Sequence, residues 1–339
     1  MRSQSWPGDL EHSKNFAASK HSKALKRKDK RYNPTRWRQV QFIQNQSRAR
    51  AVDAPKIFSI LTNTDAVAAY FDTVRYSQQH REFIRLNLAE IGYTDLPTVS
   101  LLMAHMFDTR LPWGYLLVTT PKEEQPKEIF KKVKFHESVM NKNSDSTHFL
   151  SRRDVAVNEA HTLSILERAS KFYGGKKTTE LNPILTEIFS NTNNHADRNE
   201  VGVVPWLITM AENEEEKSIE FCVIDLGIGI YDSLTYKGEE ISRSLIAAAV
   251  EAVAKFFRSS QNETLCENIP DGLLSTTKLT YRGQGIKEIF DKVTKGPFNN
   301  FEIITNLARV DLLNIRAIRD DSLYNFRGTL YHWTLKYES

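Results

Sequence analysis

The first half of the chain, from residue 53 to residue 140, alternates between two kinds of hydrophobic pattern. Short apolar or alternating runs predict strands over 56–61, 83–88 and 113–119. Apolar residues at helical spacing predict helices over 65–76 and 98–107, a charged helix that runs to Lys132, and a short end piece over 133–139. Strands that alternate with helices indicate a small α/β layer domain over 53–140.

The second half, 155–339, has longer elements. Helices are predicted over 157–173, from about 178 to 195, and over 241–257. Strands are predicted over 201–210, 218–224, 301–306, 310–316 and 329–337. The first two of these strands are expected to pair as a hairpin around the acidic turn 212–217. Residues 141–154 are polar, and we expect them to be a linker between the two halves.

One helical stretch, 184–195, carries polar side chains in an unusual arrangement. Glu187, Asn191 and His195 are four residues apart, so they share one face of a helix. Residues 190–194 are Ser, Asn and Thr, which cost roughly half a kcal/mol each against Ala in a helix. A stretch that departs from helix propensity where such side chains line up indicates a site, although a solvated polar face is the alternative.

Three glycine-containing stretches follow. The strand 218–224 ends at Asp225 and is followed by a turn with Gly227 and Gly229. Later, Gly283 and Gly285 precede an amphipathic helical pattern. The last of these stretches, Gly328-Thr329, precedes the terminal strand.

Taken in order, these four stretches resemble the N, G1, G2 and G3 boxes of the GHKL ATP-binding family. The pattern Glu187-x3-Asn191-x3-His195 is closest to that of anti-sigma-factor serine kinases and histidine kinases within the family. The resemblance covers about 155–337 and implies a two-layer α/β sandwich with ATP and Mg²⁺ as cofactors.

The resemblance also implies a role for each residue on the first helix and strand. Asn191 would be the Mg²⁺ ligand, since Mg²⁺ keeps several waters and needs few protein ligands. Glu187 would polarise the attacking water. His195 would contact phosphate or orient the loop, or else satisfy carbonyls at the helix end. Asp225 would accept a hydrogen bond from the adenine amino group, with Gly227 and Gly229 turning beneath the base.

The remaining boxes would hold the phosphates and the far side of the base. Gly283 and Gly285 would offer backbone N–H groups to phosphate, with Arg282 adding charge. Residues 258–282 would form a lid that orders when nucleotide binds. Thr329 would bond near the adenine from the final sheet.

The N-terminal half resembles a STAS domain through its strand–turn–helix order around 93–98. Phosphorylatable STAS domains have a serine directly after the aspartate, but Asp95 is followed by Leu96. We therefore expect a structural or partner-binding version, with a protein partner.

Charge sets the first 50 residues apart. They hold 13 Lys and Arg against three acidic residues, which leaves +10 there and −6 over the rest of a chain of net charge +4. Basic residues interleaved with Tyr32 and Trp37 are typical of nucleic-acid binding, but a solvated tail or an arm docked on the acidic body has the same pattern. We expect a tail over 1–52, with a short helix or strand near 37–43.

Cysteine usage and hydropathy give little chemistry. Cys222 lies within an apolar strand, so we expect a buried thiol, and Cys222 and Cys266 have no metal-ligand spacing. No signal peptide and no apolar run near 18 residues is present, so we expect a cytoplasmic protein without membrane insertion.

The sequence therefore predicts an α/β protein with a STAS-like domain over 53–140 and a GHKL domain over 155–339. The expected function is Mg²⁺-dependent ATP binding with slow hydrolysis, acting as a regulatory switch. Two alternatives stay open: a protein kinase acting on a partner, and a nucleic-acid-associated ATPase that uses residues 1–50.

Overall fold

The computed structural model describes most of the chain from residue 49 onward. The described residues are 49–80, 82–106, 116–141, 147–151, 159–175, 178–195, 205–227, 229, 289, 292–306, 308–314, 316–319 and 326–337. Contacts divide the chain into two compact units, 1–50 and 51–339. The expected helix or strand near 37–43, the helix over 241–257 and the lid over 258–282 lie outside the described residues.

Residues 50–141 form a small α/β unit, which we call the N-terminal module. Its strands make a three-stranded sheet in the order β1 (Arg50–Asp53), β3 (Ile84–Asn87), β5 (Leu116–Val118), and a parallel pair of β2 (Ile57–Phe58) with β4 (Tyr93–Thr94). Its helices are α3 (Thr64–Gln79), α4 (Leu96–Met106), α5 (Glu124–Lys132) and α6 (Phe135–Asn141). The alternation of strands and helices expected from the hydrophobic pattern is confirmed, with shorter strands than expected.

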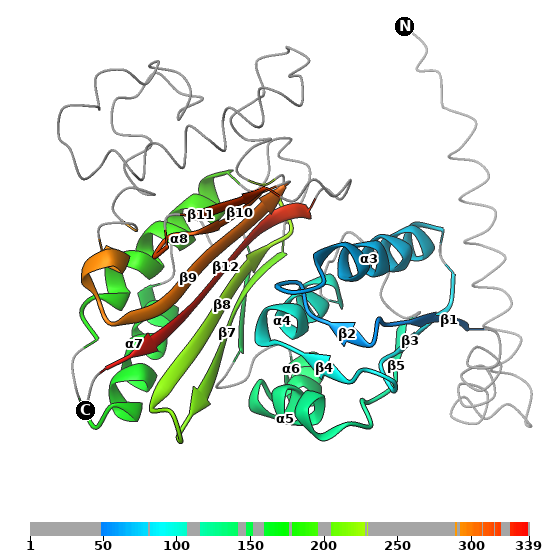
Figure 1. The fold of residues 1–339 in the computed structure, drawn as a ribbon, viewed down its shortest axis with the longest axis horizontal. Coiled ribbons are helices and arrows are strands. Elements are labelled where there is room, and N and C mark those ends of the chain that lie inside the picture. Colours follow the sequence, from blue (N-terminus) through cyan, green and yellow to red (C-terminus); the bar gives the residue numbers. More distant parts are fainter. Residues whose placement is uncertain are drawn as a thin grey trace, which may run out of the picture. The chain divides into compact units, whose positions relative to one another are not determined.

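The second half contains a seven-stranded sheet in which every pairing is antiparallel. The strand order is β11-β10-β9-β12-β8-β7-β6. The strands are β6 (Thr147–Ser151), β7 (Pro205–Asn213), β8 (Ser218–Asp225), β9 (Phe298–Asn306), β10 (Ala308–Asp311), β11 (Arg316–Arg319) and β12 (Phe326–Lys336). Two helices, α7 (Glu159–Phe172) and α8 (Leu181–His195), lie along one face of this sheet, as Figure 1 shows. The described part of the chain is thus a mixed α/β structure, and the expected β7–β8 hairpin is confirmed.

Three predicted segments differ from the structure. Residues 50–52, expected to belong to the tail, are part of β1, which pairs in the three-stranded sheet of the module. Residues 147–151, expected to lie in a linker, form the edge strand β6 on β7, because Phe149 and Leu150 add apolar residues to an otherwise polar stretch. The prediction of a single strand over 310–316 is wrong, since the chain turns between β10 and β11. The Asp311 carboxylate accepts hydrogen bonds from the backbone N–H groups of Leu313 and Asn314, at 3.0 and 3.1 Å, and this interaction ends β10.

The side chains on the α8 face of the sheet form rows across four strands, because paired residues on antiparallel strands point the same way. The register of β7, β8, β12 and β9 sets each row. One row is Met210, Phe221, Trp333 and Phe301, and the next is Ile208, Val223, Tyr331 and Ile303. In the first row the Trp333 ring stacks between Phe221 and Phe301, with centroids 5.2 and 5.4 Å away. The helices α7 and α8 pack against these two apolar rows.

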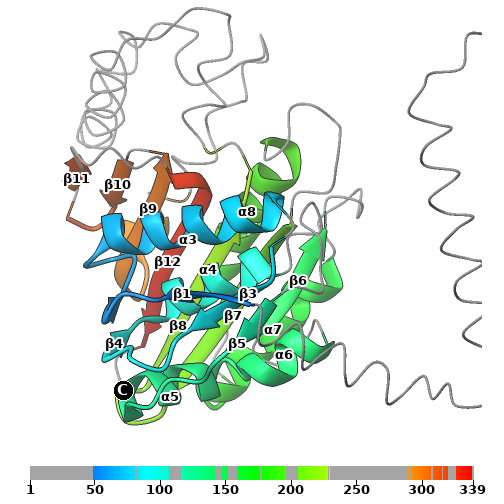
Figure 2. The same cartoon turned by 90° about the vertical axis from the view of Figure 1, so that its right-hand side faces the viewer.

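The opposite face of the sheet is covered by the N-terminal module. Leu207, Ile224 and Leu330 of the sheet belong to the same buried cluster as Leu101 and Leu102 of α4. The hydroxyls of Ser100 on α4 and Thr209 on β7 share a buried hydrogen bond of 2.6 Å. Figure 2 shows the module in front of the sheet, with α7 and α8 behind it. The two halves that we expected to be separate domains therefore share one hydrophobic core.

The helix α4 explains why the module packs in this way. Ten of its eleven residues are buried, and only His105 is not. A helix that is apolar on all sides lies within a core rather than on a surface. α4 fills this role because it lies between the strands of the module and the strands β7 and β8.

Among the described residues, no helix combines the length and the apolar character that crossing a bilayer would require.

We predict that Leu207→Ala lowers the free energy of unfolding by about 2–5 kcal/mol, because it opens a cavity in the shared core. Unfolding should remain one cooperative transition, since residues of the sheet and of the module form a single buried cluster. Denaturant titration followed by circular dichroism measures both. Leu163→Ala, at a side chain that is 56% exposed on α7, is the control and should cost less than about 0.5 kcal/mol. Two separate transitions in the wild-type chain would contradict the shared core.

Candidate functional site

A polar row ends the apolar surface of the sheet under α8. It continues the register of the rows described above and consists of Trp206, Asp225, Thr329 and Thr305. Asp225 is the last residue of β8, and Thr329 lies directly opposite it on β12. On the same face, the next residues toward the sheet centre are Val223 on β8 and Tyr331 on β12, and both belong to the hydrophobic core. The polar row is therefore the edge of an apolar surface.

The Asp225 carboxyl is buried and strongly perturbed. The Gly227 backbone N–H donates to its Oδ1 at 2.9 Å, and Thr329 donates through its hydroxyl and its backbone N–H. Burial raises the pKa of Asp225 to about 7, although these hydrogen bonds act in the opposite direction. A buried carboxyl that titrates near neutral pH at the end of a strand is a candidate for ligand recognition.

Gly328 allows the close approach of β12 to β8 at this place. Its φ is +116°, and a Cβ atom there would lie 2.0 Å from the carbonyl oxygen of Asp225. The β12–β9 register shifts between Phe326 and Thr329, so Gly328 sits in an irregularity of the ladder. A side chain at this position would push Thr329 away from Asp225.

The chain beyond Asp225 turns at once. Gly227 is buried, and Gly229 is buried with φ of +80°, which favours glycine. The sequence prediction that Asp225, Gly227, Gly229 and Thr329 belong to one locality agrees with this geometry, because β8–β12 pairing holds the first and the last together.

The helix α8 contains the other predicted residues. Glu187 is half-buried on α8, and the side chains of Asn191 and His195 lie outside the described part of the structure. α8 packs on the face to which Asp225 points, since the Phe189 ring lies 5.0 Å from the ring of Trp206, the partner of Asp225 on β7. The helix and the strand end that carry the two halves of the predicted site therefore cover the same region.

Two residues of this region were missed by sequence reasoning. Thr192 lies on the buried stripe of α8, and Trp206 begins the polar row. The Thr192 hydroxyl and the Trp206 indole N–H are buried, and neither has a hydrogen-bond partner in the described part of the chain. Buried polar atoms normally have partners, so these two indicate that a polar group can be accommodated there. The only sequence signal was a hydroxyl at an apolar helix position.

The predicted phosphate-binding residues Arg282, Gly283 and Gly285 lie outside the described residues. Ile289 and Val293, from the helical pattern that follows them, are buried in the core beneath α7 and α8. Within the described part of the structure, no group of three or more His, Cys, Asp or Glu side chains could hold a metal ion. The predicted Mg²⁺ ligand is a single amide, so this finding concerns a different type of site.

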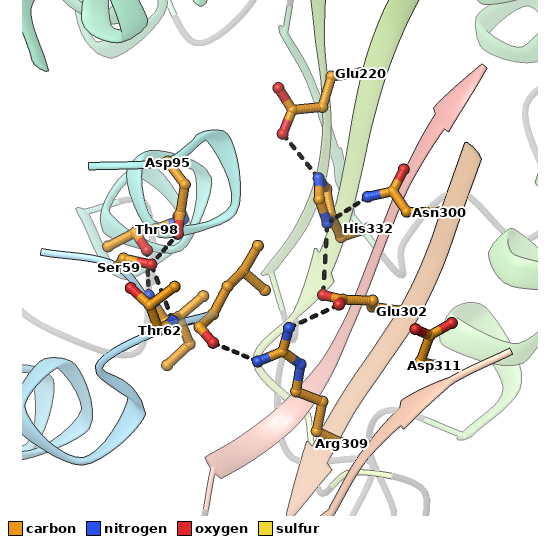
Figure 3. Close-up of polar contacts among 12 residues, drawn as sticks. Ser59, Thr62, Asp95, Thr98, Glu220, Asn300, Glu302, Arg309, Asp311 and His332 are labelled. Carbon is orange, nitrogen blue, oxygen red and sulfur yellow. Dashed lines mark hydrogen bonds and ion pairs between the residues drawn. The ribbon is translucent and has the colours of Figure 1, made fainter. Parts of the chain in front are cut away.

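A second polar cluster lies on the opposite face of the sheet, under the N-terminal module (Figure 3). His332 on β12 is its centre: Nε2 lies 2.7 Å from Glu220 Oε1, and Nδ1 lies 3.8 Å from Glu302 Oε2. Burial alone would lower the pKa of His332, but the two carboxylates outweigh it and raise the pKa to about 9. His332 is therefore a buried cation at neutral pH.

The cluster reaches the module through Arg309 of β10. Its guanidinium contacts Glu302 Oε1 at 2.6 Å and donates a hydrogen bond to the backbone carbonyl of Leu61 in the module. Burial would raise the pKa of Glu302, but the hydrogen bond from Arg309 and the nearby His332 imidazolium keep the pKa lowered. Glu302 thus stays ionised between two cations.

The segment of the module that Arg309 contacts is fixed to the start of α4. The Ser59 hydroxyl donates to the Asp95 carboxylate, which also accepts a 2.8 Å hydrogen bond from the Thr98 backbone N–H. The Ile60 backbone N–H donates to Thr98 Oγ1 at 2.6 Å. Burial raises the pKa of Asp95, against the effect of these bonds. Figure 3 shows the two groups facing each other across the boundary between the module and the sheet.

We predict that Asp225→Asn removes a pH dependence of stability. The wild-type carboxyl has a raised pKa in the folded state, so its contribution is present below the unfolded value of 3.8 and is lost as pH rises through 7. Between pH 5 and pH 8 this loss should be about 2–3 kcal/mol. Urea titrations at both pH values measure it. An equal loss in Asp225→Asn and wild type would show that Asp225 does not titrate in this range.

We predict a second pH effect for His332→Gln in a higher range. His332 also has a raised pKa, so its stabilisation is complete below 6.5 and is lost as pH rises through about 9. Wild-type stability should fall by about 2 kcal/mol between pH 7 and pH 9, and the variant should not share that fall. Thermal unfolding of wild type and His332→Gln at pH 7 and at pH 9 measures the two losses of stability. An equal loss in the two proteins would refute the prediction.

Comparison of the chain with models of known protein families, with curated proteins and with solved structures gave no match in any of the three.

Proposed function

We propose that residues 155–339 bind ATP in the manner of the GHKL family, with slow Mg²⁺-dependent hydrolysis that serves as a regulatory switch. The observation that carries the proposal is the buried Asp225 carboxyl at the end of β8, which lies opposite Thr329 and is followed by the buried glycines Gly227 and Gly229. The four motifs of the sequence that suggested the family include these residues.

The chemistry of the Asp225–Thr329 pair suits adenine. An ionised carboxylate accepts the hydrogen bond that the adenine amino group offers, whereas guanine presents a carbonyl oxygen at that place. Thr329 has a hydroxyl that can either donate or accept, so it can complement a ring nitrogen or a bridging water. Because the carboxyl is buried, guanine would leave it without a hydrogen-bond donor. The cost of that unpaired buried group increases the selectivity for adenine over guanine.

The unpartnered polar atoms support a ligand in the same region. Thr192 on α8 and Trp206 on β7 are more than nine-tenths buried. A ligand seated between α8 and the end of β8 would offer polar groups to them. Below the row, Ile208, Val223 and Tyr331 supply an apolar floor that excludes water.

The phosphates and metal would lie toward residues that the structure describes only in part. Bound Mg²⁺ would neutralise phosphate charge, and Asn191 of α8 is its expected ligand. Glu187 lies one helical turn before Asn191 on the same helix, which suits a general base that orients the attacking water. Arg282, Gly283 and Gly285 remain the expected phosphate contacts.

The regulatory part of the proposal rests on the shared core. A nucleotide bound beside Asp225 would adjoin a sheet whose other face is packed against the N-terminal module. We take the module, with its STAS-like order, as the element that communicates with a protein partner. The protein-kinase and nucleic-acid alternatives stay predictions from the sequence.

We predict that a fluorescent ATP analogue binds the full chain with Mg²⁺, and that affinity rises about tenfold between pH 6 and pH 8. The rise follows from a carboxyl of pKa about 7 that must ionise to accept the amino hydrogen. Asp225→Asn should weaken binding at pH 8 at least tenfold and should remove the pH dependence. Thr192→Val, which removes only the hydroxyl, should weaken it about three- to tenfold.

The matched control is Lys122→Ala, at an exposed residue of the module, which should bind like wild type. Absence of saturable binding by wild type would refute the proposal. Phosphate release that is lost in Glu187→Ala, with binding retained, separates hydrolysis from binding. Transfer of labelled γ-phosphate to a partner protein would favour the kinase instead.

A further inference from the structure

The strand β12 carries one residue of each polar cluster. Thr329 lies on the α8 face opposite Asp225, and His332 lies on the other face opposite Cys222. The two residues are three positions apart on one of the central strands of the sheet. Any shift of β12 against β8 at the Asp225 end therefore acts on the surroundings of His332.

A continuous path of polar contacts runs from His332 into the module. His332 forms an ion pair with Glu302, and Glu302 forms an ion pair with Arg309. The Arg309 guanidinium then donates a hydrogen bond to the Leu61 carbonyl. From there the backbone leads to Ser59 and Asp95 at the start of α4. We call the contacts among Glu220, His332, Glu302, Arg309 and the Leu61 carbonyl the coupling chain (Figure 3).

A second contact joins the same two places. Leu226 directly follows Asp225, and its side chain is buried in the core that the sheet shares with the module. The carboxyl and the next side chain along the chain thus belong to opposite faces. A ligand that repositions Asp225 or the turn to Gly227 would move a residue that packs with the module.

The coupling chain is poorly suited to serve only to stabilise the packing of the module on the sheet. Replacing buried ionic networks by apolar residues is often neutral or stabilising, because desolvation offsets the attraction. Here some hydrogen-bonding capacity is also unused: Glu302 Oε2 and Arg309 Nε are buried without a hydrogen-bond partner among the described residues. A fully satisfied buried polar network fixes one arrangement of its members, whereas a partly satisfied network fixes its arrangement less strictly.

We propose that the N-terminal module is the output element of the nucleotide site, and that the coupling chain transmits the state of that site to the segment 59–64 and α4. The inference rests on the proposed function, because it requires a ligand beside Asp225. In the nucleotide-bound protein β12 and the turn after Asp225 are held in place, and the Arg309 contact to the Leu61 carbonyl is tightened. Loss of the nucleotide relaxes the same contact.

Hydrogen exchange measured by mass spectrometry tests the coupling directly. The amides of Ile60, Thr62 and Asn63 are hydrogen-bonded within the module, so a peptide covering 59–64 reports on this segment. With a non-hydrolysable ATP analogue and Mg²⁺, the full-length wild type should exchange this peptide at least threefold more slowly. In Arg309→Met the nucleotide should have no effect on it.

Thermodynamic linkage gives an independent readout. If nucleotide binding tightens the contact at Leu61, then loss of that contact must weaken nucleotide binding by the same factor. Arg309→Met should therefore raise the Kd at least threefold, although Arg309 belongs to the cluster on the opposite face. Glu302→Gln, which keeps the side-chain volume, should show both effects, and Lys122→Ala should show neither. Near-UV circular dichroism of each variant confirms that it is folded.

The outcomes separate this inference from the proposed function. Nucleotide binding by wild type with unchanged exchange over 59–64, or an unchanged Kd in folded Arg309→Met, overturns the coupling and leaves the proposed function intact. Absence of nucleotide binding by wild type overturns both.

Discussion

The pairing of β8 with β12 is the constraint on which the rest of the structure depends. It places Asp225 opposite Thr329 and sets the rows of side chains on both faces of the sheet. The pairing can be this close at its end only because residue 328 is glycine, since a Cβ atom there would collide with the Asp225 carbonyl. One ladder thus fixes the polar row on one face and the position of His332 on the other.

Each face of the sheet has its own chemistry. On the α8 side, two apolar rows end in a polar row, so burial there stabilises the helices and leaves polar atoms at one end. On the module side, an apolar region lies next to a group of charged residues centred on His332. The raised pKa of Asp225 and the raised pKa of His332 have opposite origins. Burial favours the neutral carboxyl, whereas two carboxylates favour the charged imidazole.

Local patterns made much of this predictable. The alternation that ends at Asp225 identified β8, and the acidic turn identified the β7–β8 hairpin. These features depend on spacing within a few residues. The proximity of Asp225 to Thr329 was suggested by family resemblance, and the structure brings the two together through pairing across about 100 residues of chain.

Other features depend on partners that are distant in sequence. The uniform burial of α4 was visible as an apolar run, but the sheet that covers it could not be inferred from that run. The cluster around His332 joins residues from β8, β9, β10 and β12 with a carbonyl of the module, and no single stretch carries its pattern. The strand β6 was missed because its polar flanks outweighed two apolar residues, and the break at Asp311 was missed although Asp and Asn are turn residues.

A crystal structure of the full chain with Mg²⁺ and a non-hydrolysable ATP analogue tests the central claim most directly. The account predicts the adenine amino group within about 3 Å of the Asp225 carboxylate, with the base near Thr329 and the triphosphate running toward α8. A nucleotide bound elsewhere on the molecule, with Asp225 still enclosed by Gly227 and Thr329 alone, would contradict it.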